Sequence, residues 1–188
     1  MMRAIRTDAD RDPEFGAWIT NVIGAEKIKQ CIHCGQCSGS CPLAKYMDRS
    51  PRQLMHLARE GFRDEVLQSS AIWLCTSCYT CTIKCPRGIK VTDVMYALKR
   101  RAIEDGVYAK RFSVPVLAQE FQKMVAQHGR INEIRLATIL YLKTNLRGLP
   151  GRALLGRDLM RTGRFSLKNE KIRGQKELQT LLDAAGRD

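Results

Sequence analysis

Apolar side chains recur along this chain with the spacing of amphipathic helices, and apolar and polar residues nowhere alternate convincingly. The first such segment follows Asp12 and Pro13, which suit the cap and the first turn of a helix. Gly24 is expected to end it. Its apolar stripe consists of Trp18, Ile19, Val22 and Ile23. We therefore predict a short N-terminal helix that lies against the core.

Two longer helices are predicted in the middle of the chain. The first begins with a capping-box pattern at Ser50 and Gln53 and ends near Gly61, after which residues 62–67 can add a turn or two. Its apolar positions are Leu54, Met55, Leu57 and Ala58. The second is expected to be capped by Thr92 and to end near Gly106. Its predicted buried face consists of Val94, Met95, Leu98 and Ala102.

The C-terminal part also has helical periodicity. A helix is predicted from Ser113 to His128, with Gly129 after its end, and Asn132 is expected to cap the next helix. Residues 148–151 interrupt the pattern with glycine and proline, and a short apolar segment follows them. A last helix is expected around residues 177–184.

All eight cysteines lie between residues 31 and 85, in two copies of the pattern C-x2-C-x2-C-x3-C-P. In such runs three thiolates surround one iron–sulfur cubane, and the fourth cysteine binds the cubane of the other run. We therefore predict two 4Fe–4S clusters and a role in electron transfer. The expected ligands are Cys31, Cys34, Cys37 and Cys85 for one cluster, and Cys75, Cys78, Cys81 and Cys41 for the other.

Two other uses of the cysteines fit the pattern less well. Zinc sites usually combine two separate C-x2-4-C pairs, which two triplets do not provide. A disulfide framework belongs to an oxidising compartment, and the first residues have no apolar stretch typical of a signal peptide.

Because helical segments surround the cysteines, we expect an all-α fold, an α-helical ferredoxin with clusters in the loops between helices. The strand-rich βαββαβ ferredoxin fold is disfavoured by the same periodicity. We expect residues 1–24 to form the N-terminal helix, residues 25–106 the cluster domain, and residues 107–188 a basic helical extension for docking to other subunits.

The chain has 32 basic and 19 acidic residues, which gives a formal net charge of +13. Ten of the basic residues lie between Lys143 and Lys176. This excess favours an acidic protein partner, with a merely solvated surface as the alternative, and we expect no nucleic acid. No apolar run approaches the ~20 residues of a membrane span, so we expect a cytoplasmic chain that does not cross a membrane.

Other candidate residues are few. The sequence has no G-x-G-x-x-G or Walker A loop, so no nucleotide or flavin is expected. His33 lies inside the first run, but eight cysteines already supply the ligands, which favours a packing or hydrogen-bonding role. His56 and His128 are expected to be structural or exposed. Positive charge near the second cluster would raise its reduction potential, although solvated side chains fit equally well. The basic residues there are Lys84, Arg87 and Lys90.

Several features beyond the cysteines form a family pattern. They are Pro42 and Pro86 after the two runs, the segment from Ser50 to Met55, Ile72-Trp73 before the second run, and Ile89 with Val91-Thr92-Asp93 after it. With these features the chain from about residue 15 to 180 resembles the C subunit of heterodisulfide reductases and related complexes of sulfur metabolism. The cysteine runs alone also occur in iron–sulfur subunits of succinate dehydrogenases, fumarate reductases and glycolate oxidases.

The resemblance implies an electron relay to a catalytic B subunit whose Cys-Cys-Gly motifs carry the disulfide chemistry. The donor would be a flavin-bearing A subunit or, in membrane forms, a haem-bearing partner. This chain has no adjacent cysteines, so we expect a non-catalytic subunit of an oxidoreductase complex. The alternatives are an iron–sulfur subunit of a glycolate oxidase- or succinate dehydrogenase-like enzyme, and a binding module that its clusters only stabilise.

Overall fold

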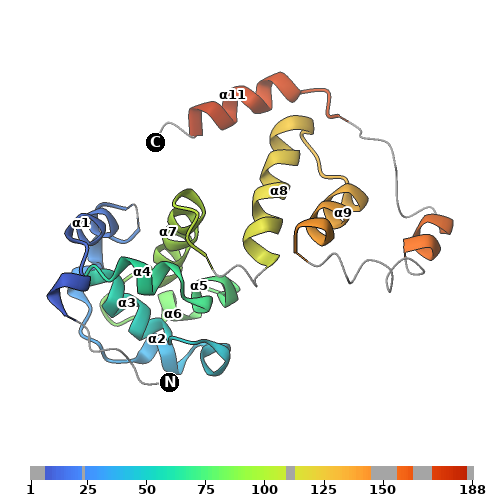
Figure 1. Ribbon diagram of the computed structural model, residues 1–188. Helices are drawn as coiled ribbons and strands as arrows, with labels where there is room; N and C mark the ends of the chain where they lie inside the picture. Colours follow the sequence, from blue (N-terminus) through green and yellow to red (C-terminus); the bar gives the residue numbers. More distant parts are fainter. Residues whose placement is uncertain (1–6, 23, 109–112, 145–155, 163–170, 186–188) are drawn as a thin grey trace. The chain divides into compact units, whose positions relative to one another are not determined.

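The computed structural model describes residues 7–22, 24–108, 113–144, 156–162 and 171–185. Ile23 and the predicted interruption at residues 148–155 lie outside the described residues. The chain divides into two units, Met1–Ala109 and Lys110–Asp188, and each is described here by itself. The described residues form helices and no strand, so the all-α prediction is confirmed (Figure 1).

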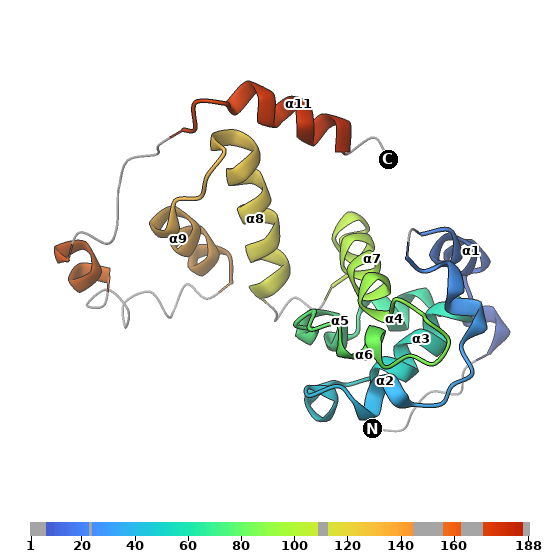
Figure 2. The ribbon, with the colours of Figure 1, turned by 180° about the vertical axis from the view of Figure 1, so that it is seen from behind.

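Unit 1 consists of short helices around one apolar core, seen from two sides in Figures 1 and 2. Its α-helices are α1 (Pro13–Asn21), α2 (Gln36–Gly39), α3 (Pro51–Arg59), α4 (Arg63–Leu67), α5 (Ser70–Leu74), α6 (Thr80–Ile83) and α7 (Val91–Glu104). Its 3-10 helices are η1 (Asp8–Asp10), η2 (Glu26–Gln30) and η3 (Ala44–Tyr46). Both runs of cysteines lie within this unit, in the loops and short helices between the longer ones.

Helix α1 is capped as predicted, because the Asp12 carboxylate accepts a hydrogen bond from the N–H of Phe15 at 3.0 Å. It ends at Asn21, so the prediction that it continues to Gly24 is wrong. Val22 adopts an extended conformation, and its carbonyl accepts from the N–H of Ala25 in a turn instead. Phe15 and Ile19 are the buried residues of this helix.

Helix α3 has the predicted capping box between Ser50 and Gln53, and its predicted apolar positions are all buried. It ends before Gly61, whose φ of +84° lies in the left-handed region. The Gly61 carbonyl accepts from the N–H of Asp12 at 2.8 Å, and a Cβ at this glycine would lie 2.6 Å from the Asp12 carbonyl oxygen. Glycine therefore lets the start of α1 contact the end of α3 closely.

Helix α7 ends before Gly106 and buries the predicted face, but Thr92 is not its cap. Lys90 occupies the cap position, and its carbonyl accepts from the N–H of Val94 at 3.2 Å. Thr92 lies one residue inside the helix and is 1% exposed. Its N–H donates to the Thr82 hydroxyl at 3.0 Å, so a residue of the second cysteine run caps α7.

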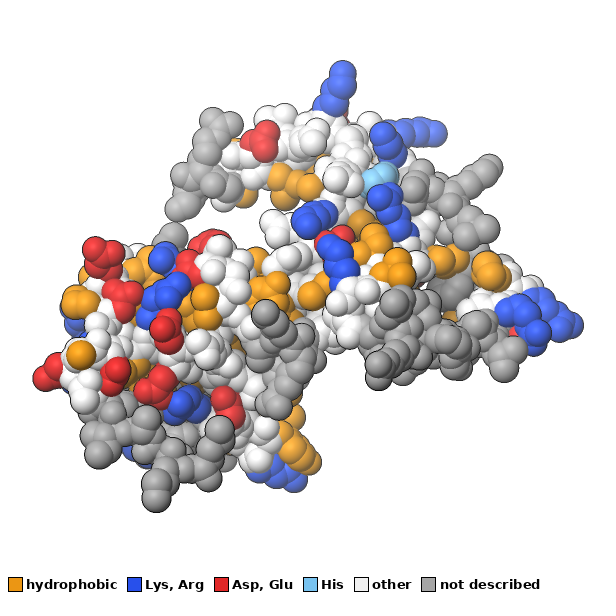
Figure 3. Space-filling model, in the orientation of Figure 1, with side chains coloured by type: hydrophobic (Ala, Val, Ile, Leu, Met, Phe, Trp, Pro, Cys, Tyr) orange, Lys and Arg blue, Asp and Glu red, His pale blue; other side chains and the backbone are white. Residues whose placement is uncertain are grey.

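Unit 2 contains α8 (Ser113–His128), α9 (Glu133–Thr144), a short helix at residues 156–161 and α11 (Gln175–Ala185). The predicted helix limits near Gly129 and the Asn132 cap are confirmed, since Asn132 Oδ1 accepts from the N–H of Arg135 at 3.0 Å. Helix α8 packs against α9 and α11. On the face of the molecule in Figure 3, acidic side chains gather over unit 1, whereas the charged side chains of unit 2 are mostly basic.

Candidate metal centres

The two cysteine runs share one backbone conformation. The residues on either side of the second cysteine of each run have left-handed dihedral angles: His33 and Gly35 in the first run, Ser77 and Tyr79 in the second. A short helix then begins at once, α2 in the first run and α6 in the second. Left-handed residues next to right-handed ones form concave nests of N–H groups, which are common at iron–sulfur sites.

The repeat extends to the helices that follow the runs. The Ser38 hydroxyl accepts from the N–H of Arg52 at 2.9 Å, just as the Thr82 hydroxyl accepts from the N–H of Thr92. Each hydroxyl directly follows the third cysteine of its run, so it ties that cysteine to the start of α3 or α7.

A second pair of equivalent hydrogen bonds holds the first cysteine of each run. Arg59 Nη1 in α3 donates to the Cys31 carbonyl at 3.2 Å, and Lys99 Nζ in α7 donates to the Cys75 carbonyl at 2.9 Å. With the hydroxyl contacts, these bonds make unit 1 an internal repeat in which each long helix holds its own triplet of cysteines.

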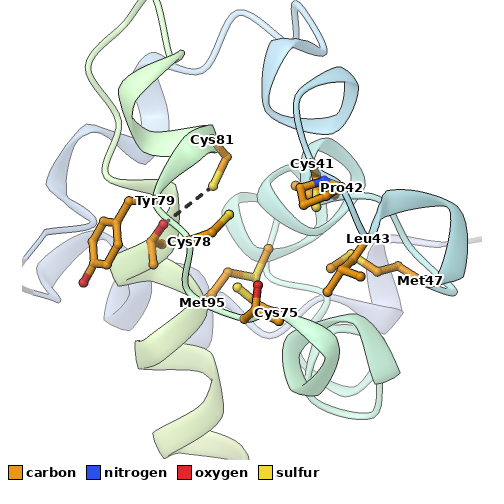
Figure 4. A pocket seen from close by; sticks show the side chains of 12 residues that line it. Cys41, Pro42, Leu43, Met47, Cys75, Cys78, Tyr79, Cys81 and Met95 are labelled. Atoms are coloured by element: carbon orange, nitrogen blue, oxygen red, sulfur yellow. Dashed lines mark hydrogen bonds between the residues drawn. The ribbon is translucent and has the colours of Figure 1, made fainter.

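Four cysteines line each of two hollows between the halves. The first hollow, of about 370 Å³, contains Cys31, Cys34, Cys37 and Cys85. The second hollow, of about 400 Å³, contains Cys41, Cys75, Cys78 and Cys81 (Figure 4). These are the two sets that the sequence predicts as ligands, so each fourth cysteine lies with the triplet of the other run. Their assignment as iron ligands stays a prediction.

Comparison with known proteins identifies this part of the chain. Residues 27–89 match the family model of the 4Fe–4S dicluster domain. This stretch is a 4Fe–4S dicluster domain. The prediction of two 4Fe–4S clusters is thereby confirmed.

The relatives are iron–sulfur subunits of methanogenic archaea. The C subunit of ferredoxin:CoB-CoM heterodisulfide reductase from Methanosarcina mazei is 44% identical over 79 residues, which is 42% of this chain and 48% of the relative. The C subunit of H(2):CoB-CoM heterodisulfide,ferredoxin reductase from Methanothermobacter thermautotrophicus is 36% identical over 98 residues, 52% of each chain. The iron-sulfur C subunit of CoB--CoM heterodisulfide reductase from Methanopyrus kandleri is 40% identical over 83 residues, 44% of this chain and 43% of the relative.

These relatives confirm the resemblance to the C subunit of heterodisulfide reductases. The chain spans about half the length of the curated relatives it matches. Within the part of the chain that the structure describes, we find no helix with the length and apolar character that crossing a membrane requires.

The second hollow of the dicluster domain is mainly apolar apart from its thiols. Its walls include Leu43, Met47 and Met95 (Figure 4). Asp48 joins the loop after Cys41 to helix α5, because its Oδ1 atom accepts from the hydroxyls of Ser69 and Ser70 and the N–H of Ala71 at 2.8–3.0 Å. Burial opposes ionisation of Asp48, but the hydrogen bonds from Ser70 and its neighbours outweigh it and lower the pKa of the carboxyl.

The first hollow has apolar walls and a cationic side. Met55, Ile89 and Val91 line it together with Arg52 and Arg87. Lys84 and Lys90 are exposed and do not line it. The expectation that Arg87 lies beside the second triplet is wrong, because Arg87 follows Cys85, whose side chain lies in the first hollow.

The sulfur atoms of both hollows have hydrogen-bond partners. The N–H of Ile89 donates to Cys85 Sγ at 3.4 Å, and the Thr92 hydroxyl lies 3.6 Å from Cys81 Sγ. Burial raises the pKa of the Cys81 thiol. Burial and the neighbouring thiols of Cys31 and Cys81 raise the pKa of Cys37 to about 11. Hydrogen bonds from Thr80 lower the pKa of Cys78.

These features fit a 4Fe–4S cluster in each hollow. Four crowded thiols with raised pKa values become stable thiolates only beside a positive charge, which iron supplies. Apolar walls limit access of water, and N–H or hydroxyl donors to sulfur set the reduction potential.

Several residues of the dicluster domain were not singled out as site residues from the sequence. His33 packs edge-on against His56 with ring centroids 4.9 Å apart, and its Nε2 atom is buried without a hydrogen-bond partner in the described structure. Burial, followed by the nearby charges of Arg59, His56 and Arg52, lowers the pKa of His33. An alignment of the two halves would have revealed Arg52, since it stands where the second half has Thr92.

Proposed function

We propose that this chain is the electron-transfer subunit of a heterodisulfide reductase-like complex. Its two clusters would relay electrons between a flavin- or haem-bearing donor protein and a catalytic subunit of the Cys-Cys-Gly type. The observation that carries the proposal is the pair of hollows, each lined by three cysteines of one run and one of the other. The relatives named above are all C subunits of such reductases, which supports the choice of complex.

The residues proposed to hold the clusters are the eight cysteines in the crossed sets given above. Each cluster, when bound, accepts and releases one electron. Cys37 of the first hollow and Cys81 of the second lie close enough for each thiolate to disfavour the other. This proximity supports transfer of an electron from one cluster to the other inside the domain.

Exposed groups at both hollows support contact with two redox partners. Cys34 of the first hollow and Cys78 of the second are both exposed. Ile32 beside the first hollow is 61% exposed, and Ile83 in helix α6 is 79% exposed. Large exposed apolar side chains at such positions are typical of surfaces that other proteins cover. One hollow would therefore receive electrons and the other would deliver them.

Unit 2 is proposed to attach the chain to these partners. In helix α8, Leu117 is 37% exposed and Phe121 is 46% exposed, whereas Met124 is buried. An apolar face of this kind, on a unit with an excess of basic residues, fits a partner surface that is apolar and acidic. Reactive groups for substrate chemistry are not expected on this chain, because it has no adjacent cysteines.

Anaerobic purification of the complex from the native host tests this proposal. We expect a protein rich in Cys-Cys-Gly motifs to co-purify, together with a flavin- or haem-bearing protein. Co-purification with a flavoprotein dehydrogenase alone would instead support a glycolate oxidase- or succinate dehydrogenase-like enzyme. A chain that purifies without any redox protein would contradict both assignments.

A further inference from the structure

A polar cleft lies beside the first hollow of the dicluster domain. It is lined by His33, Arg52, Gln53, His56 and Arg59. His33 and Arg52 also line the first hollow, so the cleft and the hollow share two side chains. No carboxylate lines the cleft. Its guanidinium, imidazole and amide groups offer mainly hydrogen-bond donors.

The donors of this cleft are only partly satisfied by the protein. Arg59 contacts Glu60 at 2.8 Å and the carbonyl of Cys31. Arg52, in contrast, makes no ion pair among the described residues, and only its backbone N–H has a partner there. The Nε2 atom of His33 is buried without a partner. A buried polar atom without a partner costs free energy, which a bound acceptor would recover.

The second half of the repeat provides a natural comparison. The residues equivalent to His33, Arg52, Gln53, His56 and Arg59 are Ser77, Thr92, Asp93, Tyr96 and Lys99. The single cation of this set, Lys99, lies over the Tyr96 ring at 5.6 Å and donates to the Cys75 carbonyl. Asp93 adds a negative charge. The cationic cleft is therefore a feature of the first half alone and is not required by the shared fold.

We propose that this cleft is an oxyanion-binding site whose occupancy is linked to the oxidation state of the cluster in the first hollow. The ligand is a group with anionic oxygens, either a free phosphate-type anion or a carboxylate presented by a partner chain. Arg52 makes the link, because its side chain borders both the cleft and the hollow. The proposal rests on the proposed function to the extent that it requires a redox-active first cluster.

The direction of the effect follows from charge. Reduction adds an electron to the cluster, and a nearby anion disfavours that added negative charge. An oxyanion beside Arg52 therefore lowers the midpoint potential of the first cluster, and reduction weakens anion binding by the same factor, because coupling between two sites is reciprocal. We expect on the order of a tenfold loss of anion affinity on reduction, within the usual range for coupled sites. The second cluster, without a cationic cleft, serves as an internal control.

The test uses the full chain with both clusters loaded under anaerobic conditions. Its redox titration is followed by EPR at constant ionic strength, with chloride, inorganic phosphate or a hexaglutamate peptide as the anion. We expect phosphate or the peptide to lower the midpoint of the first cluster and to leave the second unchanged. A shift with phosphate indicates a free anion, and a shift with the peptide alone indicates a presented carboxylate. Equal shifts of both clusters, or no shift with either probe, would overturn the proposal.

Two variants locate the effect at the cleft. Arg52→Thr introduces the residue of the second half and is expected to abolish the anion-dependent shift, whereas Arg52→Lys retains the charge and should retain much of it. Calorimetric titration of the oxidised, loaded proteins with phosphate provides a readout that does not depend on electron transfer. If phosphate binds but the cluster cannot be reduced, the proposed function fails and the anion site stands. If the cluster cycles and Arg52→Thr changes neither binding nor midpoint, the anion site is wrong.

Discussion

The hydroxyl of Thr92 lies 3.6 Å from Cys81 Sγ, inside the second hollow of the dicluster domain. Thr92 Oγ1 also accepts a hydrogen bond from the Thr82 hydroxyl at 3.0 Å. Its own hydrogen is therefore free to point to the sulfur. Once Cys81 is a thiolate, only Thr92 can be the donor of this pair. Thr92 thus gives the second cluster a buried neutral donor, where the first cluster has the cation of Arg52.

Replacing Thr92 by Val is expected to lower the midpoint potential of the second cluster. Hydrogen bonds to cluster sulfurs stabilise the reduced, more negative state, and valine removes the donor at nearly constant shape. The measurement is an EPR-monitored redox titration of the loaded protein. Thr92→Ser keeps the hydroxyl and is the matched control, so an equal shift in both variants would attribute the effect to packing.

Much of unit 1 follows from short-range patterns that can be recognised in the sequence. The capping box at Ser50 and the helix end at Gly61 depend on neighbouring residues alone, so both were predicted. The role of Thr92 was not, because its N–H is satisfied by Thr82, a residue of another helix that only tertiary structure brings near. The end of α1 was missed for a similar reason, since apolar spacing continues through Val22 while the backbone turns.

The two sets of cysteines were predicted from their spacing, but their surroundings were not. Spacing defines which thiols can share a cluster, whereas the side chains beside them come from α3 and α7. Arg52 and Met55 reach the first hollow because α3 packs next to its triplet. The asymmetry between the hollows therefore emerged only when the equivalent positions of the two halves could be compared in space.

Crossed ligation predicts which cluster each fourth cysteine supports. Cys41→Ser should damage the cluster of the second triplet, and Cys85→Ser that of the first, because each side chain lies in the hollow of the opposite run. EPR spectra of the reduced variants identify the cluster that is lost or altered. Damage confined to the cluster of the same run in both variants would contradict this arrangement.

Gly61 and Gly106 form a matched pair for the packing of unit 1. Both have positive φ angles, but a Cβ meets the Asp12 backbone only at Gly61 and finds open space at Gly106. Gly106→Ala should therefore cost about 1 kcal/mol of unfolding free energy, the penalty of left-handed alanine. Gly61→Ala should cost on the order of 3 kcal/mol, since the α1–α3 contact must also shift. Anaerobic thermal denaturation compares the variants, and equal midpoints would show that the contact at Gly61 adapts freely.

The basic part of unit 2 is expected to act in assembly and not in cluster binding. Truncation after Asn145, which lies outside the described residues, should leave both clusters intact and weaken co-purification with the partner subunits. Reversing Arg157 and Arg161 to Glu should act in the same direction, most strongly at low salt, because salt screens exposed charges. Arg164, which also lies outside the described residues, is the third position of this series. Full recovery of the complex with the truncated chain would exclude unit 2 as the docking element.

The central claim is that this chain carries two clusters that exchange electrons reversibly. The most direct measurement is an anaerobic redox titration of the full chain, with iron and sulfide determined on the same sample. We predict about eight irons and eight sulfides per chain, as two cubanes require. We also predict two reversible one-electron transitions with different midpoints, since the surroundings of the two hollows differ. Four irons with one paramagnetic signal on reduction, or two clusters that cannot be reduced and reoxidised, would contradict the account.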